Sequence, residues 1–92
     1  MITVLIAGIA GASLGTEIAK SLRLAGGYHV IGCDPSPLAF GHYSDLCDKT
    51  VRVSLDRYID HLVEISREER VQAIIPGGEE PMRLITTAAG RF

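Results

Sequence analysis

Short apolar runs alternate along the chain with amphipathic stretches. Residues 2–7 form one such run, and residues 71–75 form another that only Gln72 interrupts. Runs of this length are typical of strands that are buried on both faces of a parallel sheet. Residues 28–33 predict a further strand, and residues 50–53 predict a more exposed one because apolar and polar side chains alternate there. The pattern therefore predicts four strands.

Helical spacing appears in the segments between these strands. In residues 16–25 apolar side chains recur three or four positions apart, and two glycines follow as a helix stop. Residues 56–70 predict the clearest helix, with charges on one face and an apolar face made of Ile59, Leu62, Val63 and Ile65. Residues 79–89 predict a last helix. Residues 38–48, which follow two prolines, predict a short helix or a loop.

These elements form four strand–helix units of about 23 residues each. Such repetition predicts right-handed crossovers and an α/β fold: a Rossmann-like open parallel sheet of four strands, in the order 3-2-1-4, with helices on both faces. The length of 92 residues predicts a single domain, 1–92. No fifth strand follows, and the last residues stop where a helix normally leads into one. We therefore expect the chain to be the N-terminal fragment of a larger protein.

Composition and charge exclude several classes of function. The chain is 47% apolar and 22% charged, which is ordinary for a globular domain. Its net charge is −2 and the basic residues do not cluster, so neither nucleic acid nor a membrane surface is an expected partner. Tryptophan is absent and few residues are aromatic, which makes a base-stacking surface unexpected.

The cysteines and the N-terminus favour a cytoplasmic protein. Cys33 and Cys47 are too far apart for a C-x-x-C motif and too few for a disulfide framework, so we expect both to be reduced and structural. Residues 2–14 lack the basic start of a signal peptide and contain glycine breaks. They are also shorter than the roughly 18 apolar residues of a membrane span.

Two glycine-rich loops are the main candidates for ligand binding. In a sheet of this order, ligands bind at the carboxyl ends of the strands where the order reverses, here between the first and fourth strands. Residues 8–15 and 76–80 are expected to face each other there across one crevice. Glycines let backbone amides approach an anion at a helix N-terminus, so the candidate substrate-binding residues include Gly8, Ala10, Gly11, Gly77 and Gly78. The alternative is that a tight strand-to-helix turn needs small residues for packing.

The first loop matches neither common nucleotide motif. Its spacing, G-x-x-G-x-x-x-G, departs from the dinucleotide fingerprint G-x-G-x-x-G and lacks the Lys-Ser/Thr ending of a P-loop. Asp34 does end the second strand nineteen residues after Gly15, where nicotinamide enzymes have a ribose-binding acid, and it is a candidate binding residue. An Asx-turn before Pro35 explains the same residue equally well.

Acidic residues open the last predicted helix. Glu79 and Glu80 are stabilised there by the helix dipole, which is a sufficient structural reason for them. Alternatively one of them, with Glu79 as the candidate, binds a substrate ammonium or hydroxyl group. The three histidines, His29, His42 and His61, fall on different elements without companion acids, so no metal site is predicted. No catalytic residue is predicted either, since Ser13 has no base and no G-x-S-x-G context.

Three stretches together resemble a known family. They are the glycine-rich opening at 4–15, residues 30–45, and Tyr58 to Asp60 followed by residues 71–76 and an acidic loop. The second stretch follows the family order of Gly-Val-Asp, Pro, Gly-x-Tyr and Ala-Asp, with Ser44 in place of the alanine. From end to end the chain resembles the N-terminal, pre-ATP-grasp domain of ATP-grasp ligases, and it looks most similar to carbamoyl phosphate synthase large-subunit-like proteins.

The resemblance implies an activity for the parent protein rather than for this chain alone. In such ligases ATP activates a carboxylate as an acyl phosphate, and an amine or a similar nucleophile displaces the phosphate. The first domain supplies a wall of the substrate site and packs against the ATP-grasp domains, which are its implied partners together with a small carboxylate substrate. ATP and magnesium are implied for the parent protein, and no cofactor is implied for this chain. The family's ATP-binding lysines and magnesium carboxylates lie beyond Phe92.

Two alternatives and one assembly prediction stay open. The chain could be the NAD(P)-binding domain of an oxidoreductase, or a non-catalytic α/β interaction module. If the chain is the first domain of a larger protein, the apolar strand at 71–75 is expected to leave a bare sheet edge. The helix predicted at 79–89 is amphipathic, and its apolar residues are Met82, Leu84, Ile85 and Ala88. We therefore expect a homo-oligomer through that strand or that helix.

Overall fold

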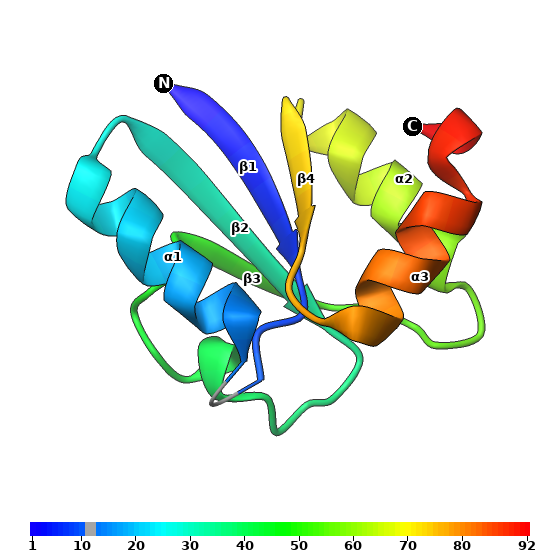
Figure 1. Cartoon of the computed structure of the whole chain (residues 1–92), viewed down its shortest axis with the longest axis horizontal. Coiled ribbons are helices and arrows are strands. Elements are labelled where there is room, and N and C mark those ends of the chain that lie inside the picture. The colour runs from blue at the N-terminus through cyan, green and yellow to red at the C-terminus, as the bar shows by residue number, and fades with distance from the viewer. Residues whose placement is uncertain (11–12) are drawn as a thin grey trace.

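Strands and helices alternate along the chain as the sequence pattern predicts (Figure 1). The computed structural model describes residues 1–10 and 13–92. Their elements, in chain order, are β1 (Ile2–Ala7), α1 (Leu14–Ala25), β2 (Tyr28–Asp34), the 3₁₀ turn η1 (Phe40–His42), β3 (Lys49–Arg52), α2 (Tyr58–Glu68), β4 (Ala73–Pro76), α3 (Glu79–Thr87) and the 3₁₀ turn η2 (Ala89–Arg91).

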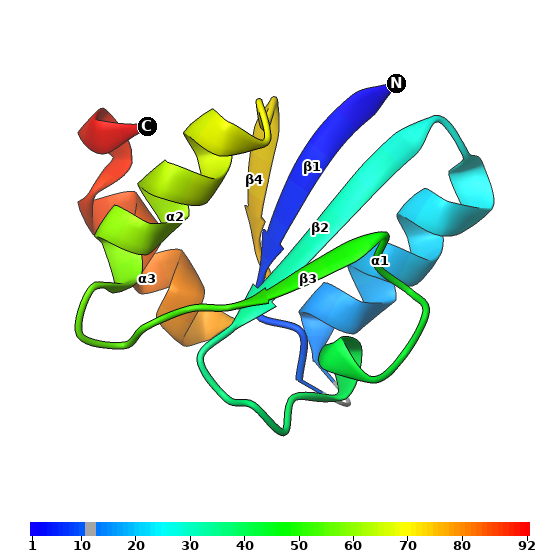
Figure 2. The same cartoon turned by 180° about the vertical axis from the view of Figure 1, so that it is seen from behind.

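All strand pairs in the sheet are parallel, and the order is β3-β2-β1-β4, which confirms the predicted fold class and strand order. β1 lies in the middle: Val4 is in register with Val30 of β2 and with Ala73 of β4. β3 and β4 form the two edges, as the view from behind shows (Figure 2). The order reverses between β1 and β4, so the carboxyl ends of these two strands mark the expected ligand edge.

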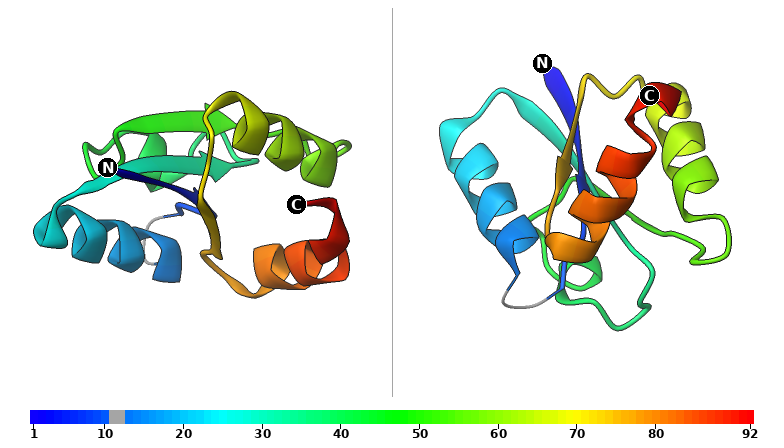
Figure 3. Two further views of the ribbon diagram at one scale, coloured as in Figure 1. Left: turned by 90° about the horizontal axis from the view of Figure 1, so that it is seen from above. Right: turned by 45° about the vertical axis from the view of Figure 1, so that its right-hand side comes forward.

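The sheet has a hydrophobic core on each face. Successive side chains of a strand point to opposite faces; accordingly, Leu5 packs with Leu62 of α2, whereas Ile6 packs with Ala19 of α1. α3 also contributes to the α2 side through partly buried apolar residues, so α2 and α3 cover one face and α1 covers the other (Figure 3). This double burial explains why the sequence of β1 is an apolar run. No helix among the described residues is long and apolar enough to span a membrane.

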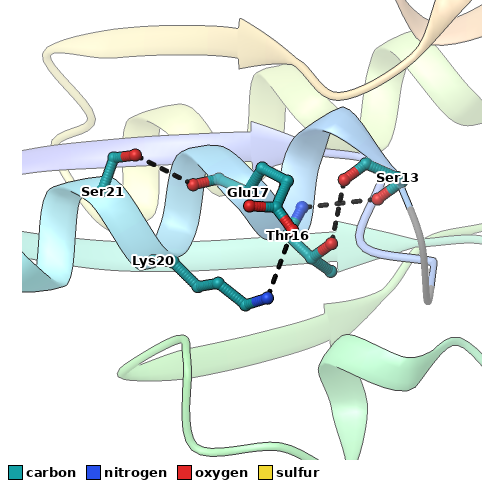
Figure 4. Close-up of polar contacts among 5 residues, drawn as sticks. All are labelled: Ser13, Thr16, Glu17, Lys20 and Ser21. Atoms are coloured by element: carbon teal, nitrogen blue, oxygen red, sulfur yellow. Dashed lines mark hydrogen bonds and ion pairs between the residues drawn. The ribbon is translucent and has the colours of Figure 1, made fainter.

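Local polar contacts fix the start of α1. Ser13 is the N-cap: its Oγ accepts a hydrogen bond from the Thr16 amide at 3.3 Å, and the Thr16 hydroxyl donates to the Ser13 carbonyl at 2.9 Å. One turn later Lys20 pairs with Glu17 at 3.2 Å, and the Ser21 hydroxyl donates to the Glu17 carbonyl (Figure 4). The helix ends at Gly26, whose φ of 76° is left-handed. The first turn of α1 is therefore capped by the Ser13 side chain.

Several element boundaries differ from the predictions by one or two residues. β4 begins at Ala73 rather than at residue 71, because α2 ends in a left-handed turn at Arg70 (φ 55°) and the Val71 amide closes that turn on the Ser66 carbonyl at 2.9 Å. α2 begins at Tyr58 rather than at residue 56. The segment 38–48 forms only the short η1 turn.

Candidate functional site at the carboxyl edge of the sheet

The two glycine-rich loops touch instead of facing each other across a crevice. The Gly15 amide donates to the Gly77 carbonyl at 3.2 Å, and the Gly77 amide donates to the Ala7 carbonyl at 2.7 Å. A Cβ atom on Gly15 would lie 1.8 Å from the Gly8 carbonyl oxygen, and one on Gly77 would lie 2.2 Å from that same oxygen. The crevice predicted between these loops is therefore closed here, because residues without side chains let the two backbones pack directly.

Most described amides of the first loop are used within the protein. The Gly8 amide donates to the Cys33 carbonyl at 2.8 Å, and the Ile9 amide donates to Asp34 Oδ2 at 3.0 Å. The exposed Ala10 accepts the Ser13 amide through its carbonyl at 3.2 Å. Gly11, the other candidate in this loop, lies outside the described residues. Amides engaged in this way cannot also bind an anion, so the geometry favours packing over anion binding as the role of this loop.

Asp34 holds the loops after β1 and β2 together. Its side chain is only 9% exposed; Oδ2 accepts the Ile9 amide, and Oδ1 accepts the Ser36 amide at 3.0 Å. The second bond is the Asx-turn that the following proline suggested. With both carboxylate oxygens engaged by backbone amides, the geometry supports the turn interpretation over the ribose interpretation.

A cavity of about 240 Å³ opens beside this junction, on the face covered by α2 and α3. Gly8 and Asp34 reach it from the ends of β1 and β2, and Leu55 and Tyr58 reach it from the segment after β3. α3 completes the wall with Glu80, Pro81 and Leu84. The cavity thus joins the carboxyl ends of the strands to the first turn of α3, at the edge where the sheet order predicts a ligand.

Three groups in or near this cavity, Tyr58, Glu80 and Cys33, have shifted pKa values that fix their protonation states at neutral pH. Burial, and after it nearby negative groups that include Asp34 and Glu80, raises the pKa of the Tyr58 hydroxyl, which therefore stays protonated at neutral pH. A fork of hydrogen bonds from Arg83, at 3.1 and 2.5 Å, lowers the pKa of Glu80 and keeps it anionic. Burial, together with the charge of Asp34, raises the pKa of Cys33 to about 12, so no thiolate nucleophile forms there at neutral pH.

Of the two glutamates that begin α3, the one that lines the cavity is not the predicted candidate. Glu79 is exposed and does not line the cavity, whereas its neighbour Glu80 does. Gly78 is the N-cap of α3 in an extended conformation, and a Cβ added there would meet only Pro81 Cδ, at 3.8 Å. The sequence does contain a signal for Glu80, because residues four apart share a helix face and Leu84 packs against the core.

Tyr58 and Leu55 were not identified from the sequence. Tyr58 lies one turn before Leu62 on the core face of α2, so its spacing indicates burial and gives no sign of the nearby cavity. Leu55 is 73% exposed in an irregular segment. Their place at the site follows only from the path of the chain between β3 and α2.

The cysteines lie on opposite faces of the sheet. Cys33 belongs to the core on the α2 side, and Cys47 packs on the α1 side, where its Sγ would lie 2.7 Å from a Cβ on Gly32. Both are free thiols. Across residues 1–10 and 13–92, no cluster of three His, Cys, Asp or Glu side chains could hold a metal ion.

A larger cavity, of about 480 Å³, lies away from this edge. It runs beside the outer edge of β4 and is lined by Arg67, Val71, Ile74, Ile85 and Phe92, among others. β4 pairs with β1 on its other side, and it is an edge strand of the sheet. Association of copies through β4 or α3 stays a prediction; light scattering checks it, and a strictly 9.9 kDa species up to millimolar concentration would contradict it.

A scan against protein-family models finds no match to the chain, and neither does a search of curated protein sequences. Function is therefore inferred from the residues and geometry of the carboxyl edge.

Proposed function

We propose that the chain is the substrate-side domain of an ATP-dependent carbon–nitrogen ligase of the ATP-grasp type, similar to the large subunit of carbamoyl phosphate synthase. The observation that carries the proposal is the cavity of about 240 Å³ at the carboxyl edge, next to the reversal of strand order. The three sequence stretches that resemble the pre-ATP-grasp domain supply the family. The proposed partners are ATP-grasp domains, which bring ATP and magnesium.

The proposed contribution of this chain is to bind and orient substrate. In the proposed reaction a carboxylate oxygen attacks the terminal phosphorus of ATP and ADP leaves; the nitrogen nucleophile then attacks the acyl carbon, phosphate leaves, and the nitrogen loses a proton. Glu80 is anionic in its ion pair with Arg83, which a substrate ammonium group would have to share, and the Tyr58 hydroxyl is protonated. A carboxylate and a phenol in one small cavity suit an ammonium or hydroxyl group, which accounts for a role in holding the nucleophile.

Binding measurements on the chain test the cavity assignment. Methylammonium serves as the probe, and NMR follows the backbone amides of Leu55, Tyr58 and Glu80. The variant Glu80→Gln is expected to weaken binding about tenfold, because a charge-assisted hydrogen bond is lost. Glu79→Gln is the matched control: the same change one residue earlier, in an exposed residue outside the cavity, is expected to leave the affinity unchanged.

Nucleotide binding separates the proposal from its alternatives. The described loops offer few amides for phosphate, so calorimetry is expected to find no micromolar affinity for Mg·ATP or for NADH. ADP release should require ATP-grasp domains beside the chain, and Glu80→Gln should then raise KM for the nitrogen substrate. Micromolar binding of NADH would replace the ligase proposal with the oxidoreductase alternative, and micromolar Mg·ATP binding by the chain alone would overturn it.

A further inference from the structure

A second cavity, of about 450 Å³, adjoins the candidate site. Pro35 and Leu55 line both cavities, so the two share a wall. The rest of its lining comes from the end of β3, the segment that follows and the first turns of α2, and the polar members are Arg52, Ser54, Asp56 and His61. The sequence pattern predicts only that residues 34–37 and 54–56 are loops at the carboxyl edge of the sheet, and it assigns no function to these polar residues.

Arg52 is anchored without being neutralised. Its Nε donates to the Pro35 carbonyl at 3.2 Å, which fixes the guanidinium at the boundary of the two cavities. Arg57, Arg83 and Arg91 each form an ion pair with a carboxylate. Arg52 forms no ion pair with any acid in the described part of the chain, so its terminal nitrogens keep their charge and their donors for a ligand.

His61 presents a donor to the same space. Its Nδ1 accepts the Ser54 amide at 3.2 Å. That bond assigns the proton of the neutral ring to Nε2, because Nδ1 must keep its lone pair to accept. Arg52, His61 and Ser54 thus bring a fixed positive charge and neutral donors to one cavity.

We propose that this cavity is an anion-binding subsite that takes a carboxylate or phosphate group. The Arg52 guanidinium presents a planar fork suited to the oxygens of either group, and His61 Nε2–H and the Ser54 hydroxyl add donors. Asp56 is the one carboxylate among the residues that line the cavity, and it opposes an anion there. Removing its charge should therefore tighten binding.

The subsite also defines the substrate class, and this step rests on the proposed function. A ligand that spans the shared wall meets Glu80 and Tyr58 at one end and Arg52 and His61 at the other. It therefore carries an ammonium or hydroxyl group together with a carboxylate or phosphate. Amino acids and phosphorylated alcohols or amines have this chemistry.

The direct test is an NMR titration of the ¹⁵N-labelled chain at constant ionic strength, with inorganic phosphate in one arm and acetate in the other. Saturable shifts are expected at the amides of Ser54, Leu55 and His61. The arm that saturates at the lower concentration identifies the preferred anion. Shifts that do not saturate in either arm, or that fall elsewhere, overturn the subsite.

Variants separate specific binding from general attraction to positive charge. Arg52→Gln is expected to weaken anion binding about tenfold, Arg52→Lys to weaken it less, and Asp56→Asn to tighten it. Arg23→Gln removes an equal charge from α1, on the other face of the sheet, and is expected to have no effect. The same spectra report whether each variant is folded. Equal losses in Arg52→Gln and Arg23→Gln, with both folded, would contradict the proposal.

Failure of the two proposals can be told apart. Glu80→Gln should leave phosphate binding unchanged while it weakens methylammonium binding. Phosphate binding without methylammonium binding leaves the anion subsite in place and removes the assignment of the smaller cavity. Methylammonium binding without phosphate or acetate binding keeps the assignment of the smaller cavity and removes the anion subsite.

Discussion

The carboxyl edge of the sheet has two halves that are built differently. Between β1, α1 and the start of α3, backbone packs on backbone through Gly8, Gly15 and Gly77, and most of the described loop amides donate within the protein. On the side of α2 and α3, side chains surround two adjoining cavities of about 240 and 450 Å³. The half richest in glycine, which the sequence favours as the ligand site, is the closed one.

This difference shows that glycines in a loop can be needed for the close packing of two backbones rather than for exposing amides to a ligand. A glycine-rich turn exposes amides to an anion only where nothing else packs against it. Here the loop after β4 occupies that position, and its own glycine makes the approach possible. Room for a ligand then remains where longer side chains line the surface after β2 and β3.

Gly15→Ala is expected to have the largest effect on this comparison. The new Cβ would lie 1.8 Å from the Gly8 carbonyl oxygen, so the start of α1 must move away from the end of β1, and this movement breaks the bond from the Gly15 amide to the Gly77 carbonyl that joins the two loops. We expect a loss of at least ~3 kcal/mol in the free energy of unfolding, measured in urea.

Gly78→Ala is the matched control for that variant. Gly78 has an extended backbone, and its Cβ would meet only Pro81 Cδ at 3.8 Å, an ordinary contact distance. Its expected cost is within ~0.5 kcal/mol. Equal stability of the two variants would mean that the loops do not touch.

Asp34→Ala is expected to cost less, about 2–4 kcal/mol, because the amides of Ile9 and Ser36 lose a charged acceptor in a buried setting. Asp34→Asn keeps one acceptor oxygen and should cost about half as much. Thermal or urea unfolding at pH 7 checks both variants. Unchanged stability in Asp34→Ala would mean that the carboxylate does not hold the two loops together and is free to bind a ligand.

Arg70→Gly should have a small effect, of the opposite sign. Arg70 is the one non-glycine residue with a positive φ (55°) in the described part of the chain, at the end of α2. Glycine adopts this conformation without steric cost, so the variant is expected to gain about 0.5–1 kcal/mol of unfolding free energy. A loss of stability would indicate that the arginine side chain contributes more than its backbone costs. Together, Arg70→Gly and Gly15→Ala would show that a left-handed turn tolerates a side chain, whereas the packed junction at Gly15 does not.

Much of the fold could be predicted because local patterns determine it. The bounds of β1 match the predicted residues 2–7, since an apolar run buried on both faces is flanked by glycine. The strand order is that of a doubly wound sheet, in which the fourth strand adds on the other side of the first. The start of β4 was missed because the left-handed turn at Arg70, a residue type that rarely adopts it, leaves no signal in the sequence.

The site could be predicted only in part. Gly8 and Asp34 do lie at the cavity, since strand ends of a parallel sheet share one edge. The contact between Gly15 and Gly77 depends on distances that arise only when the β1 and β4 loops fold together. Arg52 and His61 are nine residues apart on a strand end and a helix, and their meeting depends on the path of the segment between them.

Amide hydrogen exchange tests the central claim most directly, because a closed loop and an anion-binding loop differ in whether their amides are free. The amides of Gly8, Ile9, Gly15 and Gly77 all donate within the protein. The account predicts that they exchange as slowly as those of the central strand β1, opening only with global unfolding. Rapid exchange at Gly8 and Gly15 while β1 stays protected would show that these amides are open to a ligand, and would contradict the account.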